Sequence, residues 1–208
     1  MGLIHYYHIF CSDRFYPIVQ EHFNACRKYG LLDEAQEVRI GLVGSQQMRD
    51  DAKILLRWFG DFSVVAEAEQ GWEQVTLSHL QSSAQSGDVL FYAHTKGAFS
   101  GTEFAAQWRR TMCYENVVKW PDRVMDLANH TTSGAFWVRS SCEEHKEHQS
   151  FYGGNYWWTT GEYVHGLPPI RNDHRYQAEG WIGLHPNPNP FDCRPGDPVP
   201  ANFRHGSL

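Results

Sequence analysis

The first hundred residues alternate between short apolar segments and longer amphipathic ones. Runs of apolar, β-branched or aromatic residues predict strands over residues 3–11, 38–43, 62–66 and 88–93. Apolar residues at helical spacing predict helices over residues 14–29, 46–59 and 72–84. Strands that alternate with helices form a mostly parallel, doubly wound sheet, and such sheets bind ligands outside the carboxyl ends of their strands. The pattern therefore predicts an α/β protein with a ligand site near residue 94, where the fourth strand ends.

The rest of the chain has a different pattern. It predicts helices over residues 103–118 and 121–129, and strands over residues 135–139 and 155–159. From residue 184 the chain is rich in proline, which lacks the amide hydrogen that a regular helix or a central strand needs. We therefore expect one domain over residues 1–183 and a Pro-rich C-terminal tail or lid over residues 184–208.

Composition narrows the class of protein. A chain of 208 residues with 41% hydrophobic content fits one globular domain that can enclose a ligand site. The net charge of −6 disfavours general binding of nucleic acids or membrane surfaces, because such proteins usually present a basic face. The sequence shows no secretory signal pattern and no stretch with the ~20 apolar residues that span a bilayer. The five cysteines form no C-x-x-C pair, so we expect reduced thiols and a cytoplasmic protein.

The residues at the end of the fourth strand suit a diphosphate. His94-Thr95-Lys96-Gly97 combines an imidazole, a hydroxyl and an ammonium with a glycine that lets the backbone approach phosphate oxygens closely. The alternative is an ordinary turn between a strand and a loop, with Lys96 in solvent.

Three motifs follow one another along residues 70–183: His-Thr-Lys-Gly at 94–97, Trp108-Arg109, and the run Gly154-Asn155-Tyr156-Trp157-Trp158. In this order they resemble glycosyltransferase-like proteins of bacteria and viruses, which are similar in turn to rhamnan synthesis F proteins. The resemblance implies a single GT-A-like (Rossmann-like) domain that transfers a sugar from a nucleotide-sugar donor. Residues 1–100 would then form the nucleotide-sugar-binding half, and residues 101–183 the acceptor-side half. The acceptor classes left open are a polysaccharide, a glycolipid, a protein and a modified nucleobase.

The resemblance also implies the residues of the donor site. Glu73 lies in a segment that matches the family's E-x-x-T-L pattern, so it is expected to face the donor together with residues 94–97. Its alternative role is a carboxylate that stabilises a helix N-terminus. Arg109 lies on the helix after the loop and is expected to reach back to the phosphates, because a guanidinium fits phosphate oxygens. Alternatively it is a solvated surface residue.

The sequence departs from the GT-A pattern where a metal is usually held. GT-A enzymes commonly carry Asp-x-Asp at this strand end to hold a divalent cation, whereas this chain has Ala93-His94-Thr95. Hard cations such as Mg²⁺ and Mn²⁺ prefer carboxylate oxygens. We therefore favour a site without a metal cofactor, in which Lys96 neutralises the leaving diphosphate. The alternative is a Mn²⁺ or Mg²⁺ site, with His94 and His185 as ligands.

The acceptor side is expected around two aromatic segments. Along a strand, Tyr156 and Trp158 would point to one face and Asn155 and Trp157 to the other, so that one face packs on the core and the other meets sugar. The alternative is that the rings of this strand are all part of the core. Trp181 belongs to a closing R-x-x-x-E-x-W element that the family shares.

The carboxylate of that closing element is Glu179, our candidate general base. A carboxylate beside an apolar ring can have its pKa raised, which suits proton abstraction from an acceptor hydroxyl. Lys96 and His94 complete the predicted catalytic set. The alternative for Glu179 is a structural ion pair with Arg175, four residues earlier.

The hypothesis is thus a nucleotide-sugar-dependent glycosyltransferase. Two other classes stay open: a carbohydrate- or nucleotide-binding module with the same fold and no turnover, and an accessory protein that uses its aromatic residues as an interface. Hydrolysis of the donor distinguishes the enzyme from the other two classes.

Overall fold

The computed structural model describes residues 2–139, 150–171 and 176–196. Its centre is a mixed sheet of seven strands in the order β3-β2-β1-β4-β8-β5-β9. The strands of this sheet are β1 (Leu3–Phe10), β2 (Ala35–Val43), β3 (Ser63–Ala68), β4 (Val89–His94), β5 (Thr132–Gly134), β8 (Trp157–Thr160) and β9 (Pro190–Asp192). A separate antiparallel pair consists of β6 (Trp137–Arg139) and β7 (Ser150–Tyr152).

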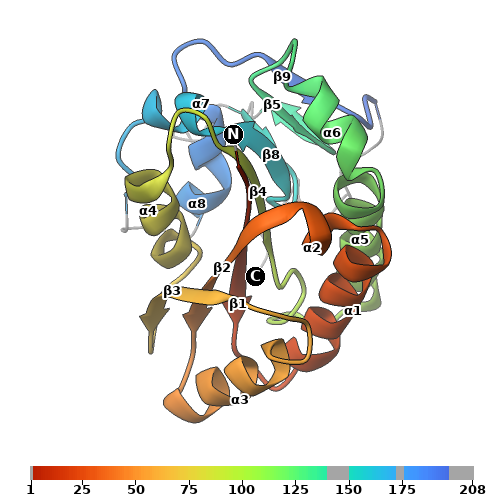
Figure 1. Ribbon diagram of the computed structural model, residues 1–208, viewed down its shortest axis with the longest axis vertical. Helices are drawn as coiled ribbons and strands as arrows, with labels where there is room; N and C mark the ends of the chain where they lie inside the picture. Colours follow the sequence, from red (N-terminus) through yellow and green to blue (C-terminus); the bar gives the residue numbers. More distant parts are fainter. Residues whose placement is uncertain (1, 140–149, 172–175, 197–208) are drawn as a thin grey trace.

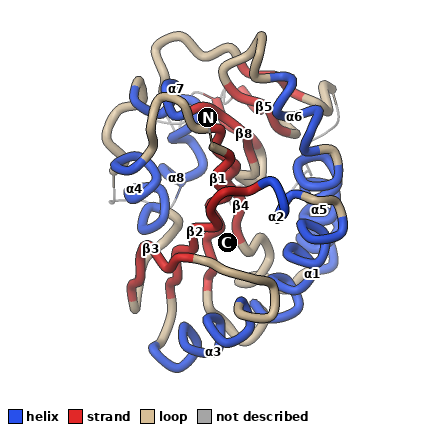
Figure 2. Tube along the Cα trace, in the orientation of Figure 1, coloured by secondary structure: helices blue, strands red, loops and turns tan. Residues whose placement is uncertain are grey.

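Helices cover both faces of the sheet, as Figures 1 and 2 show. One layer holds α1 (Phe15–Lys28), α2 (Leu31–Glu34), α3 (Gln46–Leu56), α5 (Glu103–Cys113), the π-helical turn η1 (Tyr114–Val118) and α6 (Trp120–Asp126). The other holds α4 (Gln74–Ser83), α7 (Gly161–His165), α8 (Tyr176–Gly180) and the 3-10 turn η3 (Trp181–Gly183). The protein is therefore a three-layer α/β domain with one apolar core on each side of the sheet.

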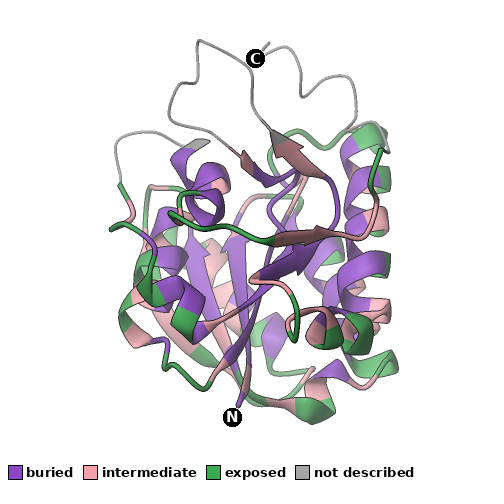
Figure 3. Ribbon diagram, turned by 90° about the horizontal axis from the view of Figure 1, so that it is seen from above, coloured by how far each residue is buried: buried purple, intermediate pink, exposed green. Residues whose placement is uncertain are grey.

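The predicted parallel half is confirmed. β1 pairs in parallel with β2 and with β4, and β2 pairs in parallel with β3. All six residues of β4 are buried, because alternate side chains enter the two cores: Phe91 packs on the α1 side and Tyr92 on the α4 side. Figure 3 shows these central strands buried between helices whose outer surfaces are exposed.

The second half departs from the prediction in its details. Of the strand expected over 135–139, only residues 137–139 form a strand, β6; β5 already ends at Gly134, and Phe136 between the two has a left-handed backbone with φ of 65°. The helix expected over 103–118 is α-helical only to Cys113 and continues as the π-helical turn η1. β8 runs antiparallel to both of its neighbours, β4 and β5, whereas β5 and β9 pair in parallel, so β8 is the strand of this seven-stranded sheet that runs against the others.

The Pro-rich segment contributes to the sheet. β9 pairs with β5 at the outer edge, where a residue without an amide hydrogen is tolerated. The Asp192 carboxylate accepts hydrogen bonds from the backbone amides of Phe136 (2.9 Å) and Trp137 (3.0 Å). The predicted tail is thus ordered at least to residue 196, and residues 197–208 lie outside the described part of the chain.

Every helix in the described ranges is too short or too polar to cross a bilayer.

Candidate active site at the carboxyl edge of β4

The site lies where the ends of β1, β4 and β8 meet. His8 near the end of β1 is the register partner of His94, the last residue of β4. Because β8 is antiparallel, its first residue, Trp157, pairs with Tyr92 close to the same edge. The loop after β4 therefore faces the turn that precedes β8, as well as the start of α4, where Glu73 is the N-cap residue.

His94 is bonded at both ring nitrogens. Its Nδ1 lies 2.5 Å from Glu73 Oε1, and its Nε2 lies 2.9 Å from the carbonyl oxygen of Gly154. A carbonyl only accepts hydrogen bonds, so Nε2 carries a hydrogen. An ionised Glu73 also only accepts, so Nδ1 carries a hydrogen as well and donates a hydrogen bond to the carboxylate. The pair is therefore an imidazolium with a carboxylate, both with 15% or less of their side-chain surface exposed.

The Glu73 carboxylate is stabilised in its ionised form. Burial alone would raise its pKa, but the charge and hydrogen bond of His94, the nearby His8 and the hydrogen bond from Asn155 together lower the pKa well below its usual value. The Asn155 amide donates to Glu73 Oε2 at 3.0 Å. Both oxygens of Glu73 thus accept hydrogen bonds from protein groups.

The turn before β8 holds this arrangement in place. Gly154 and Asn155 both have positive φ, 90° and 56°. A Cβ atom on Gly154 would overlap the Met112 sulfur, so this position requires glycine. The Asn155 side-chain oxygen accepts from Trp157 Nε1 at 2.7 Å, and the Tyr156 hydroxyl donates to the His94 carbonyl at 2.6 Å. The predicted Asn155 and Tyr156 therefore meet the predicted Glu73 and His94 directly.

The loop after β4 is fastened at Thr95, Gly97 and Arg109. Thr95 Oγ1 accepts from the Phe10 amide at 2.8 Å, which ties the loop to β1. Gly97 has φ of 89°, and a Cβ there would lie 3.1 Å from the Ala105 side chain. Arg109, which is buried, donates to the Lys96 carbonyl at 2.9 Å and to Glu21 Oε2 at 2.9 Å. The Arg109 guanidinium thus holds the loop in place through the backbone carbonyl of Lys96.

Lys96 and Glu179 bring opposite charges together at this edge. Lys96 Nζ lies 3.9 Å from Glu179 Oε1, with 17% and 13% of the two side chains exposed. The same ammonium lies 4.3 Å from the centre of a Trp108 ring, a favourable cation–π distance. α8 provides Glu179, α5 provides Trp108 and the loop after β4 provides Lys96. The structure therefore joins two predicted catalytic residues, while the alternative partner Arg175 lies outside the described residues.

Two residues of this network were missed by sequence reasoning. His8 Nδ1 lies 2.7 Å from Thr76 Oγ1, and both side chains are buried. His8 could have been found, because two parallel strands that end at one edge bring the histidines near their ends together.

The aromatic rings predicted to bind acceptor lie in the core. Trp157, Trp158 and Trp181 are each 0–1% exposed, and so are Asn155 and Tyr156. Trp157 and Trp158 do point to opposite faces of the sheet, as strand alternation predicts, because they enter different cores. The expectation that one face is open to sugar is wrong, since helices cover both faces.

Two of the predicted residues at this edge, His94 and Glu73, have their possible metal-binding atoms occupied by protein groups. Both nitrogens of His94 and both oxygens of Glu73 are bonded to protein groups, and Glu179 lies beside the Lys96 ammonium, which repels cations. His185, the alternative ligand, stacks on Tyr163 with ring centres 4.4 Å apart, and its Nδ1 accepts from the Asn187 amide.

Comparisons with known proteins bear on the fold. No family model and no curated protein matches this sequence. Among solved structures, glucosyl-3-phosphoglycerate synthase from Mycobacterium tuberculosis, in complex with Mn²⁺, UDP and glucosyl-3-phosphoglycerate, matches with a TM-score of 0.52 and 13% identity over 88% of this chain and 63% of that chain. A second structure of that enzyme, with Mn²⁺, UDP and phosphoglyceric acid, has a TM-score of 0.50 and 14% identity over 88% and 62% of the two chains. This chain thus spans less than two thirds of that synthase.

A third match covers nearly the whole of both chains. It is 4-diphosphocytidyl-2C-methyl-D-erythritol synthase from Anaerococcus prevotii, with a TM-score of 0.50 and 6% identity over 93% of this chain and 90% of that one. These similarities establish a GT-A-like α/β fold, which a glycosyltransferase and a nucleotidyltransferase share. The link to rhamnan synthesis F proteins stays a prediction from motifs.

Proposed function

We propose that this protein is a glycosyltransferase that uses a nucleotide-sugar donor and neutralises the leaving diphosphate with Lys96. One observation carries the proposal: the Lys96 ammonium lies 3.9 Å from the Glu179 carboxylate at the carboxyl edge of a GT-A-like sheet. Ligands of open α/β sheets bind at this edge, and transfer of a glycosyl group needs positive charge there, because negative charge develops on the diphosphate.

Glu179 serves as the general base in this proposal. The acceptor hydroxyl gives its proton to the Glu179 carboxylate, its oxygen forms a bond to the anomeric carbon, and the bond from that carbon to the diphosphate oxygen breaks. The diphosphate leaves with the electron pair, and Lys96 offsets its charge. In the resting protein the two side chains pair with each other, so donor binding would draw Lys96 toward the phosphates and leave Glu179 ionised for the acceptor.

The remaining predicted residues act as positioning residues. Glu73 and His94 form the buried ion pair beneath the loop, while Thr95, Gly97 and Arg109 fix the path of its backbone. The acceptor side is supported from the core by Asn155, Tyr156, Trp157, Trp158 and Trp181. No divalent cation has a step in this mechanism.

A thermal-shift screen of nucleotides and nucleotide sugars, with and without Mn²⁺, tests the donor site. A ligand at 100 times its Kd stabilises the native state by about 2.7 kcal/mol, which gives a clear rise in Tm. We expect one nucleotide sugar to raise Tm equally with and without Mn²⁺. A rise that requires Mn²⁺ would overturn the role of Lys96, and no rise with any donor would overturn the whole proposal.

Lys96→Met separates binding from folding, because the methionine keeps the apolar stem over Trp108 and removes the charge. Loss of a hydrogen bond to a charged group costs about 1.5–3 kcal/mol, so donor affinity should fall roughly 10- to 100-fold with little change in Tm. Titration calorimetry with the stabilising donor measures this. Lys28→Met is the matched control, since Lys28 lies over the Tyr29 ring at 5.1 Å on the surface. Equal donor affinity in the two variants would remove Lys96 from the site.

Glu179→Gln keeps the shape of the side chain and removes the base. Donor affinity should stay nearly constant while transfer falls by ~10²–10⁴-fold, the usual loss for a general base. Transfer is assayed with each acceptor class in turn: polysaccharide, glycolipid, protein and modified nucleobase. Glu162→Gln, an exposed carboxylate on α7, is the control. Near-normal transfer by Glu179→Gln would show that another group takes the proton.

The binding-module alternative keeps one observation in its favour. Both ring nitrogens of His94, a predicted catalytic residue, are bonded within the protein. Such a module binds the donor without splitting it, whereas transferases slowly pass sugar to water. Release of free sugar from the bound donor, lost in Glu179→Gln, would exclude the module.

A further inference from the structure

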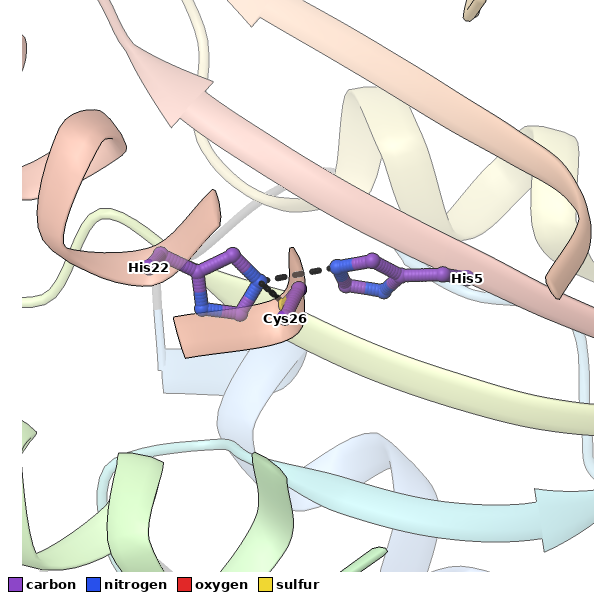
Figure 4. A group of neighbouring side chains, drawn as sticks. All are labelled: His5, His22 and Cys26. Carbon is purple, nitrogen blue, oxygen red and sulfur yellow. Dashed lines mark hydrogen bonds between the residues drawn. The ribbon is translucent and has the colours of Figure 1, made fainter. Parts of the chain in front are cut away.

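Three side chains with metal-ligating atoms meet in the core beneath α1, away from the site at β4. His5 Nε2 lies 2.8 Å from His22 Nε2, and Cys26 Sγ lies 3.5 Å from the same nitrogen. The three ligand atoms all lie within 4.8 Å of one another, and the residues are 0–2% exposed. Figure 4 shows the two imidazoles and the sulfur directed toward one another. In the described part of the chain no other group of three such residues meets this criterion.

The packing of α1 on β1 brings the three residues together. His22 and Cys26 are four residues apart on α1, so they share the helix face that packs on the sheet, and His5 projects from β1 toward that face. Aromatic rings hold both imidazoles. Tyr7 stacks on His22 with ring centres 4.2 Å apart, and Phe91 stacks on His5 at 4.6 Å. The cluster is therefore rigid before any ligand binds.

The backbone directs one lone pair into the cluster. His5 Nδ1 lies 3.4 Å from the Phe91 carbonyl, which only accepts, so the hydrogen of this imidazole is on Nδ1. The free lone pair is then on Nε2, which faces His22 and Cys26. A backbone carbonyl that accepts from the second nitrogen of a histidine is the usual support of a metal-bound imidazole.

If the three side chains only filled the core, they would lower the stability of the folded protein. Two imidazoles and a thiol occupy positions where apolar side chains would need no hydrogen bonds. The Nδ1 atom of His22 is buried without a hydrogen-bond partner among the described residues, which lowers stability. A buried polar group of this kind calls for a function.

We propose that His5, His22 and Cys26 form a binding site for one Cu(I) ion. Thiolate is a soft donor that selects ions such as Cu(I), imidazole also suits copper, and a set of two imidazoles and one thiolate suits a three-coordinate ion. Charge decides between ions: one thiolate neutralises Cu(I), whereas Zn²⁺ would leave a net positive charge in an apolar core, which is costly.

The binding step involves no oxidation or reduction. The Cu–S bond forms as the Cys26 thiol loses its proton to solvent. His22 keeps one hydrogen, which moves to Nδ1, so that Nε2 offers its lone pair to the metal. His5 already has this tautomer.

The test uses the reduced chain with Cys142→Ser and Cys193→Ser, which leaves Cys11, Cys26 and Cys113 as its thiols. Because the cluster is fully buried, the protein is refolded under anaerobic conditions with Cu(I) held by a chromogenic Cu(I) chelator. We expect one Cu(I) per chain to be withdrawn from the chelator, and X-ray absorption of the loaded protein to show one sulfur and two nitrogen neighbours. Cys26→Ser should weaken retention by about 100-fold or more.

Cys113→Ser is the matched control, because Cys113 is a second buried thiol, on α5, outside the group of three. It should retain Cu(I) like the parent chain. The X-ray absorption spectrum is recorded with His5, His22 and Cys26 all in place, so this part of the test holds even if the Cys26→Ser variant does not fold. No retained Cu(I), a spectrum without sulfur, equal loss in both serine variants, or retention of Zn²⁺ in preference to Cu(I) would each overturn the proposal.

Discussion

At the scale of single residues, His94 shows how neighbours decide what a side chain can do. An imidazole at a strand end suggests a ligand or an acid–base group. In the structure both its nitrogens are hydrogen-bond donors to Glu73 and Gly154, and its backbone carbonyl accepts from Tyr156. Because both ring nitrogens are bonded to protein groups, neither is available to a metal, and this histidine holds the loop in position.

Glu73→Gln tests the importance of this buried charge pair. The variant leaves the imidazolium without a counter-ion and places the glutamine amide against the Asn155 amide, which also donates. Breaking a buried pair costs up to about 3–5 kcal/mol, measured as the free energy of unfolding in urea. Glu67→Gln is the control, because its carboxylate pairs with Lys53 at 2.9 Å near the surface and should cost less than about 1 kcal/mol. Equal losses would mean that His94 is neutral.

At the scale of elements, the first half of the fold is predictable and the second half less so. The longer strands and helices up to residue 94 follow from apolar periodicity, because each buries a face long enough to show a period, whereas the four-residue helix α2 was not predicted. β5, β6 and β7 have three residues each, too few for any periodicity, and their pairing depends on distant partners. Neither the positive φ of Phe136 nor the π-helical turn after Cys113 can be predicted from the pattern of apolar and polar residues.

The same limit applies to the site. The edge of the sheet, Lys96 and Glu179 were predicted, and the structure brings the two side chains together. The burial of the rings was not predictable. Strand alternation assigns each ring to one of the two faces of β8, but it does not show which elements cover those faces. His22 and Cys26 did carry a signal, because residues four apart on a predicted helix share one face.

Trp157→Ala and Trp158→Ala should therefore both destabilise the protein. Each ring fills a different core and is fully buried, so truncation costs about 3–5 kcal/mol and shows as a lower urea midpoint. Trp58→Ala is the control, because that ring is 75% exposed and its loss should change stability by about 0.5 kcal/mol or less. If one buried variant keeps its stability and loses transfer, that ring contacts acceptor after all.

At the scale of the whole molecule, His8 couples the site to stability against acid. Burial lowers the pKa of His8 to about 4; Glu73 opposes this shift and His94 adds to it. An unfolded imidazole has a pKa near 6.5, so between these values the unfolded chain binds a proton that the folded chain does not. The free energy of unfolding should fall as pH falls through this window, by about 1.4 kcal/mol per pH unit from this residue.

Urea unfolding of the parent chain and of His8→Gln at several pH values between 6.5 and 4.5 measures this contribution. The variant should show the shallower dependence on pH, whatever its stability at pH 7. His130→Gln, at a partly exposed imidazole beside Asn189, should keep the slope of the parent chain. Parallel curves for all three proteins would mean that His8 is protonated in the folded state.

The pairing of β9 with β5 also has a consequence for solubility. An open sheet exposes unpaired backbone groups at its outermost strands, and these can recruit a strand from another molecule. Here β9 occupies the outer position beside β5, and it begins with Pro190. The proline nitrogen has no hydrogen, so it cannot donate a hydrogen bond to a strand of another molecule. The Cys193 amide then continues the pairing by donating to the Gly134 carbonyl at 2.9 Å. In a chain that ends before residue 189, β5 itself would be the edge strand of the sheet. The proline-rich segment therefore lowers the tendency of this edge to pair with another molecule.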